Sequence, residues 1–171
     1  MRQTCFVVLL AVLLTGVATR ARAAGCAADP DRRALDFWLG DWKVTSPGRS
    51  GAGTSQVRTE LGGCVVVESW SNGSMHGENL FAWDPGRKVW VAFIANDAGG
   101  LHVLAGHADG GGLRLEDALG APPGSTSEPL HRVRIVPARR DAVEQSWEKS
   151  TDGGSTWTAE YRGDYARTAK P

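Results

Sequence analysis

From residue 42 onward, short runs of apolar or alternating apolar and polar residues are separated by clusters of turn-forming residues. Asn72-Gly73 and Asp84-Pro85-Gly86 are typical of these turns, because Gly and Asn accept the backbone conformations that tight hairpins need. No helical period of useful length appears after Leu39. The runs predict about ten strands, at residues 42–45, 55–61, 65–71, 79–83, 89–95, 101–107, 113–117, 130–136, 143–149 and 156–165.

These strands indicate an all-β fold. Short consecutive strands at even spacing favour an antiparallel barrel or sandwich over alternating β/α units. We expect an up-and-down barrel of about ten strands, because closure removes the exposed edges of the sheet. The longest loop is expected at 118–128, either over a barrel mouth or as a disordered excursion.

The segment Asp36-Phe37-Trp38-Leu39-Gly40-Asp41-Trp42 concentrates aromatic residues just before the first predicted strand. Trp38 and Trp42 are four positions apart, which fits one helical turn, and Gly40 lets the chain leave that turn for a strand. We therefore expect a short N-terminal helix that plugs one end of the barrel, with its aromatic side chains in the core.

The first residues have the features of a secretory signal peptide. Arg2 is the positive n-region, Phe6 to Leu14 is an apolar run, and Ala21-Arg22-Ala23 is an A-x-A cleavage site. The run is too short to span a bilayer, which needs about 20 residues. We predict a signal peptide at 1–23, a single barrel domain at 24–171, and a periplasmic or secreted location.

Cleavage of the predicted signal peptide removes Cys5 and leaves two cysteines, Cys26 and Cys64. Paired cysteines in an exported chain most often form a disulfide, and this bridge would tie the mature N-terminus to the third strand. A lipid anchor on Cys26 is the alternative, although the usual Leu three residues before the Cys is missing. The two possibilities exclude each other.

The charge pattern limits the partners. The leader holds three arginines and no acidic residue, so a chain with 19 basic and 19 acidic residues becomes slightly acidic on cleavage. No basic cluster exceeds the pair Arg139-Arg140, and the sequence therefore does not predict a nucleic-acid partner. No second apolar segment is long enough to cross a membrane.

Several landmarks resemble a family of exported bacterial proteins of unknown function with a lipocalin-like (calycin) barrel. They are the Asp36–Trp42 segment, Leu61-Gly62-Gly63-Cys64, Glu68-Ser69-Trp70, Trp83-Asp84-Pro85, Gln145-Ser146-Trp147-Glu148 and the run from Ser150 to Trp157. The likeness covers nearly the whole mature chain, and the opening F-W-L-G-x-W motif is its most specific part. The resemblance implies the barrel fold and export, but no reaction and no catalytic residues.

The run from Ser150 to Trp157 also fits the Asp-box pattern S-x-D-x-G-x-T-W of sialidase propellers. It occurs once, in a chain far too short for a propeller. Asp152 can accept hydrogen bonds from turn amides, and Trp157 can pack beneath the turn. We interpret the motif as one that stabilises a β-hairpin turn and not as a sign of glycosidase activity.

The histidines are His76, His102, His107 and His131. His102 and His107 are five apart on one predicted strand, so alternation places them on opposite faces and no two-histidine metal site is predicted. A haem-binding barrel is an alternative, because related calycin folds include one with a ligating histidine. Nothing in the sequence selects one of the four, and we predict no metal and no cofactor.

Catalytic patterns are equally sparse. The sequence lacks a Gly-x-Ser-x-Gly elbow and a phosphate-binding loop. Glu68 with Glu144 or Glu148 would make a carboxylate pair for a small hydrolase or isomerase only if these side chains face the lumen. We therefore predict no catalytic residues and keep this enzyme as the alternative function.

The remaining signal is a set of aromatic and polar residues that share the predicted strands. A lumen lined by aromatic side chains, with one charged anchor, would suit a small apolar or amphipathic ligand. The alternative is that the same side chains fill the barrel, which would then have a structural role in the envelope. The predicted ligand-binding residues are Glu68, Trp70, Trp90, Arg134, Trp147 and Tyr161.

Overall fold

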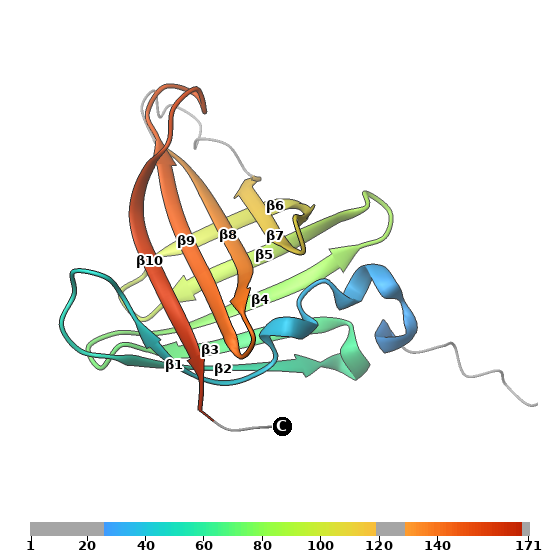
Figure 1. Ribbon diagram of the computed structural model, residues 1–171. Helices are drawn as coiled ribbons and strands as arrows, with labels where there is room; N and C mark the ends of the chain where they lie inside the picture. Colours follow the sequence, from blue (N-terminus) through green and yellow to red (C-terminus); the bar gives the residue numbers. More distant parts are fainter. Residues whose placement is uncertain (1–25, 119–128, 169–171) are drawn as a thin grey trace, which may run out of the picture.

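The computed structural model describes residues 26–118 and 129–168. Four short 3₁₀ segments and ten strands make up this part of the chain (Figure 1). They are η1 (Cys26–Ala28), η2 (Pro30–Arg33), η3 (Asp36–Trp38), β1 (Gly40–Thr45), β2 (Gly53–Glu60), η4 (Leu61–Gly63), β3 (Val65–Ser71), β4 (His76–Asp84), β5 (Val89–Asn96), β6 (Leu101–Asp109), β7 (Gly112–Asp117), β8 (Leu130–Arg139), β9 (Ala142–Ser150) and β10 (Thr158–Arg167).

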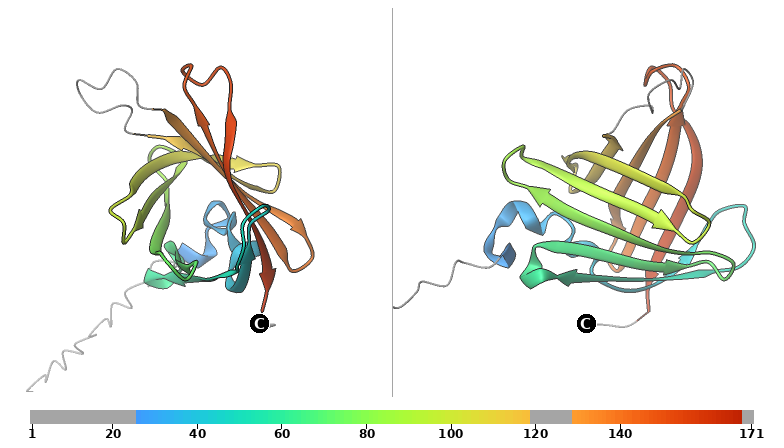
Figure 2. Two further views of the ribbon diagram at one scale, coloured as in Figure 1. Left: turned by 90° about the vertical axis from the view of Figure 1, so that its left-hand side faces the viewer. Right: turned by 180° about the vertical axis from the view of Figure 1, so that it is seen from behind.

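The strands form a closed barrel in which each pairs antiparallel with its sequence neighbours and β1 pairs with β10 (Figure 2). This architecture confirms the predicted all-β, up-and-down barrel and is compatible with a lipocalin-like fold. Several strands are longer than predicted because pairing continues into the hairpins. In β4, for example, His76 already pairs with Ser71, three residues before the predicted start.

Alternate residues of each strand point into the barrel and form one apolar core. Its buried members are Leu35, Trp38, Trp42, Val57, Val66, Phe81, Trp90, Ala92, Ile94, Leu104, Leu113, Leu115, Val133, Ile135, Val143 and Tyr165. On β8, for instance, Val133 and Ile135 are buried, whereas Arg134 between them is on the outer wall. The middle of the lumen is therefore packed with side chains.

The N-terminal segment closes one end of the barrel, as predicted (Figure 2). Trp38 at the end of η3 is fully buried and makes edge-to-face contacts with Phe81 and Tyr165, at centroid distances of 5.5 and 5.9 Å. Its carbonyl oxygen accepts a 2.8 Å hydrogen bond from Nε1 of Trp42. The tryptophan pair thus joins the 3₁₀ turn to the first strand.

Arg167 at the end of β10 holds this plug in place. Its guanidinium donates to the carbonyl oxygen of Leu39 at 2.6 Å and lies 4.2 Å from the ring centroid of Trp42. Gly40 adopts a φ of +128°, and a Cβ there would lie 2.3 Å from Nη1 of Arg167. Glycine at this position therefore permits both the exit from η3 and the close approach of the arginine.

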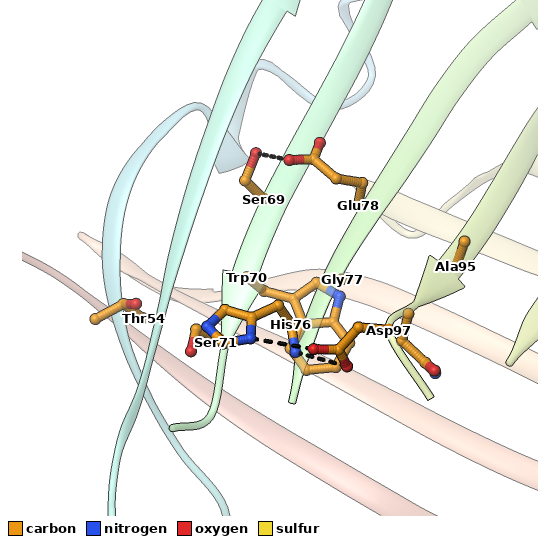
Figure 3. A pocket seen from close by; sticks show the side chains of 10 residues that line it. Thr54, Ser69, Trp70, Ser71, His76, Gly77, Glu78, Ala95 and Asp97 are labelled. Atoms are coloured by element: carbon orange, nitrogen blue, oxygen red, sulfur yellow. Dashed lines mark hydrogen bonds and ion pairs between the residues drawn. The ribbon is translucent and has the colours of Figure 1, made fainter. Parts of the chain in front are cut away.

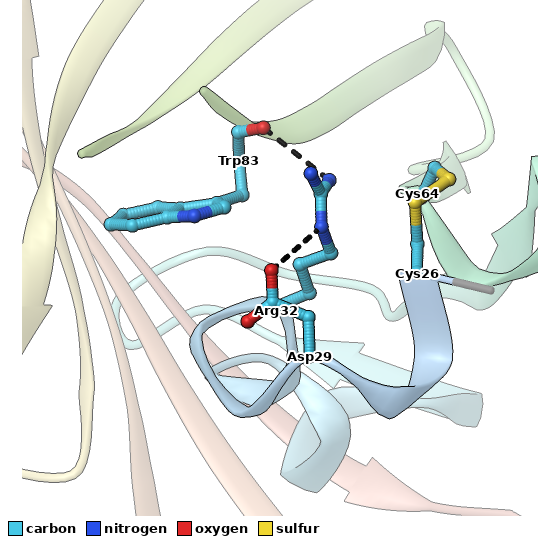
Figure 4. The surroundings of a disulfide bond; sticks show 5 residues. All are labelled: Cys26, Asp29, Arg32, Cys64 and Trp83. Atoms are coloured by element: carbon cyan, nitrogen blue, oxygen red, sulfur yellow. Dashed lines mark hydrogen bonds and ion pairs between the residues drawn. A yellow bond between two sulfur atoms is a disulfide. The ribbon is translucent and has the colours of Figure 1, made fainter. Parts of the chain in front are cut away.

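Cys26 and Cys64 form a disulfide that joins η1 to the residue before β3 (Figure 4). This confirms the predicted pairing and is consistent with an oxidising compartment. The bond occupies the thiol that a lipid anchor on Cys26 would need. Next to it, Arg32 donates to Asp29 at 3.1 Å and to the carbonyl oxygen of Trp83 at 3.4 Å, which fastens η2 to β4.

Replacing both bridged cysteines with serine should lower the free energy of unfolding by about 2–4 kcal/mol. The bridge closes a loop with a sequence separation of 38, so its loss enlarges the unfolded ensemble. Urea unfolding of the double variant beside the oxidised wild type measures the difference. Equal midpoints would show that the bond does not stabilise this fold.

The Asp-box hairpin between β9 and β10 has the predicted local role. Asp152 accepts hydrogen bonds from the backbone N–H of Thr156 at 2.8 Å and from the hydroxyls of Thr156 and Ser150 at 2.6 and 2.7 Å. These bonds lower the pKa of Asp152 to about 2. Trp157 donates from Nε1 to the carbonyl oxygen of Gly154 at 3.0 Å, closing the turn.

The predicted signal peptide and most of the long 118–128 loop lie outside the described residues. Within the described part of the chain, no helix combines the length and apolar character that a membrane span requires.

Candidate functional site

The end of the barrel opposite the N-terminal plug is the candidate site, and we call it the mouth. Inward-facing side chains meet here near the ends of six strands, next to the β3–β4, β5–β6 and β9–β10 turns. In contrast to the core, these side chains are only partly buried. The residues that define the mouth are Trp70, His102, Asp117, His131, Trp147 and Tyr161.

Three of these rings pack together on one side of the mouth. The centroid of His102 lies 4.6 Å from that of His131 and 5.1 Å from that of Trp147, in edge-to-face geometry. The centroids of His131 and Trp147 are 6.5 Å apart. The three residues come from β6, β8 and β9, and their mutual contacts limit the rotation of each ring.

Carboxylates border the histidine pair. Oδ2 of Asp117 accepts from the backbone N–H of His131 and lies 3.2 Å from Nδ1 of the same residue. On the other side of the ring, Oε2 of Glu160 is 3.9 Å from Nε2 of His131, while Oε1 is paired with Lys149 at 2.7 Å. The mouth therefore combines imidazole nitrogens with negative charge.

Burial and the neighbouring His131 together lower the pKa of His102. Burial makes the larger contribution, and Asp117 and Glu160 act in the opposite direction without reversing it. His102 is consequently neutral at pH 7, with a lone pair available on one ring nitrogen.

Trp70 lies on the opposite side of the mouth beside an open surface cavity of about 510 Å³ (Figure 3). Its indole rests on Gly77 of β4, where a Cβ would lie 2.3 Å from the ring. Glycine therefore lets the ring lie flat across the strand. The cavity is lined by Thr54, Ser69, Trp70, Ser71, His76, Gly77, Glu78, Ala95, Asn96 and Asp97.

Tyr161 of β10 completes the mouth. The guanidinium of Arg49, from the β1–β2 connection, lies 5.7 Å from its ring centroid. Burial, followed by the charge of Glu68, raises the pKa of the Tyr161 hydroxyl. The phenol thus stays protonated at neutral pH and can donate a hydrogen bond.

Glu68 lies deeper, in the middle of the barrel, and is 1% exposed. Its Oε1 accepts from the hydroxyls of Ser55 at 2.8 Å and Tyr165 at 2.9 Å, and its Oε2 accepts from Nδ2 of Asn79 at 2.7 Å. Burial raises the pKa of this carboxyl, although the three hydrogen bonds oppose the shift. A substrate could reach Glu68 only by displacing core side chains.

The structure does not bring the other sequence-predicted site residues to the mouth. Trp90 is 2% exposed and packs 6.3 Å from Trp83 near the plugged end. Arg134 does not face the lumen, because it alternates with the buried Val133 and Ile135, and it pairs with Asp109 at 3.3 Å on the outer wall.

The carboxylates considered as partners for Glu68 also face outward. Glu144 pairs with Arg162 at 2.8 Å, and Glu148 pairs with Arg132 at 2.7 Å. Neither shares the lumen with Glu68, because on β9 the inward positions belong to Gln145 and Trp147. The carboxylate pair required by the hydrolase hypothesis is therefore not formed.

Sequence reasoning missed the meeting of His102, Asp117 and His131. The available signal was that the predicted strands 113–117 and 130–136 are neighbours along the chain. The first ends at Asp117, and His131 is the second residue of the next. His102 joins them across β7 from the β5–β6 turn. Alternation relates residues within one strand, whereas this cluster forms between three strands.

No protein-family model matches this sequence, and a search of the curated proteins finds no relative.

Proposed function

We propose that this protein is an exported barrel that binds a small amphipathic molecule at its mouth. One observation carries the proposal: aromatic and polar side chains at this end remain partly exposed and three of their rings pack together, whereas the other end is closed by Trp38 and the middle is packed. Concave sites that combine aromatic walls with a few polar groups are typical of small-molecule binding.

The mouth offers distinct contacts to the two parts of such a ligand. The indoles of Trp70 and Trp147 supply apolar surface on opposite sides. Arg49 beside Tyr161, together with the neutral His102, supplies hydrogen-bond partners for a polar head group. In this proposal Trp90 and Glu68 support the barrel, and Arg134 takes no part because it lies on the outer wall.

Export supports the same function. The sequence resemblance to exported lipocalin-like proteins, the predicted signal peptide and the disulfide together favour a periplasmic or secreted carrier. A haem would need a histidine facing a largely apolar slot, whereas His131 is bordered by two carboxylates and packs against His102. The mouth therefore favours a smaller, partly polar ligand over a porphyrin.

Anilinonaphthalene sulfonate, a fluorescent amphipathic probe, tests the proposal. We expect saturable one-to-one binding that quenches Trp147, and we expect Trp147→Ala to weaken binding about tenfold because an aromatic wall is lost. Trp83→Ala is the matched control, since Trp83 is also partly buried but lies at the plugged end. Equal loss in both variants, or none in Trp147→Ala, would reject the mouth as the site.

A further inference from the structure

We propose that His102, Asp117 and His131 bind a divalent transition-metal ion of the Zn²⁺ class. Among the described residues, these three form a group whose potential ligand atoms all lie within 4.8 Å of one another. They come from the start of β6, the end of β7 and the start of β8, so three hydrogen-bonded strands position them. The inference goes beyond the proposed function, because it requires no organic ligand.

The spacing of the atoms suits such an ion. Ligand atoms about 2.0–2.1 Å from a tetrahedral Zn²⁺ lie about 3.3 Å from one another. Nδ1 of His131 and Oδ2 of Asp117 are already 3.2 Å apart. An ion between them would replace this hydrogen bond by two metal–ligand bonds, and the imidazole nitrogen of His102 that lies within 4.8 Å of both atoms would supply the third.

The surroundings provide the support that metal-bound histidines usually have. When Nδ1 of His131 binds a metal, Nε2 carries the proton and faces Oε2 of Glu160 at 3.9 Å. The ring of Trp147 packs against both histidines and limits their rotation. Both side chains of the His131–Asp117 pair are 18% exposed, so solvent can reach the site and leave a water or ligand in the fourth position.

The donor types select the class of metal. Two imidazoles and one carboxylate suit Zn²⁺, Co²⁺, Ni²⁺ or Cu²⁺, whereas Ca²⁺ and Mg²⁺ prefer sites built from oxygen ligands. The other histidine–carboxylate pair with the same 3.2 Å spacing, His76 and Asp97, provides a natural comparison. It is 69% and 53% exposed and does not belong to a three-ligand cluster among the described residues.

The experiment titrates the purified full-length barrel, without a histidine tag, with Zn²⁺ alone by calorimetry and with Co²⁺ by absorption. We expect one Zn²⁺ per chain and the intense visible bands of tetrahedral Co²⁺. His131→Ala and Asp117→Asn should each weaken Zn²⁺ binding at least about tenfold, whereas His76→Ala should bind like the wild type.

Circular dichroism checks that each variant is folded, and the conservative His102→Gln gives a second variant if His131→Ala unfolds. Absence of saturable Zn²⁺ binding by the wild type would overturn the proposal. So would wild-type affinity in folded Asp117→Asn and His102→Gln, because binding would then lie elsewhere. Metal binding without probe binding would refute the proposed function and leave this inference standing.

Discussion

Replacing Trp38 with alanine should lower the free energy of unfolding by about 3–5 kcal/mol, because a fully buried indole is exchanged for a cavity. The change also removes the edge-to-face contacts with Phe81 and Tyr165. Since Trp38 closes one end of the barrel, we expect the variant to admit an apolar dye at this end. Urea unfolding and dye fluorescence measure the two effects.

Trp38→Phe is the matched control for this prediction. Nε1 of Trp38 is buried without a hydrogen-bond partner in the described part of the chain, so phenylalanine loses volume but no hydrogen bond. We expect it to cost clearly less than alanine and to keep the end closed. If Trp38→Ala unfolds at the wild-type midpoint, the N-terminal segment is not a structural plug.

The second large effect is expected at Glu68. Glu68→Ala should cost about 3–5 kcal/mol, because it leaves a cavity and removes the shared acceptor of three buried donors, on Ser55, Asn79 and Tyr165. Glu68→Gln should cost much less. The amide introduced by Glu68→Gln can keep these partners if the side chain of Asn79 flips. Its unpaired Oδ1 then accepts from the N–H groups of the new amide.

The pH dependence of stability distinguishes the wild type from Glu68→Gln. Burial raises the pKa of Glu68 above the 4.5 of a free glutamate, so the folded state holds this proton more tightly than the unfolded state does. The contribution of the protonated Glu68 carboxyl to the free energy of unfolding is complete below pH 4.5. It is lost as the pH rises toward the pKa of Glu68 in the folded state. The slope over this window is about 1.4 kcal/mol per pH unit.

Urea unfolding between pH 4 and pH 8 tests this dependence. We expect the wild type to lose stability as the pH rises, whereas Glu68→Gln should lack that component because an amide does not titrate. Parallel pH profiles for wild type and Glu68→Gln would contradict a raised pKa at Glu68.

The fold was predictable because its signals are local. Period-two runs and Gly- or Asn-containing turns predicted the ten strands, and the Asp36–Trp42 segment predicted the plug. The Cys26–Cys64 bridge followed from the predicted export, which left two cysteines to pair.

The site was harder to predict because the alternation of apolar and polar residues predicts which face of a strand a side chain lies on. It does not predict the height of that side chain along the barrel axis. Trp70 and Trp90 both face inward, yet one lies at the mouth and the other near the plug. Height depends on the register between strands, which the sequence pattern alone does not supply. The meeting of His102 with His131 depends on this register across β7.

The indole N–H NMR signals of the tryptophans test the central claim, that the mouth is the ligand site. On titration with anilinonaphthalene sulfonate, we expect the signals of Trp70 and Trp147 to shift along one saturable curve. Those of Trp38, Trp42, Trp83 and Trp90 should stay in place, because these residues lie at the plugged end. Shifts confined to the plugged-end tryptophans, or the absence of saturable shifts at Trp70 and Trp147, would contradict the claim.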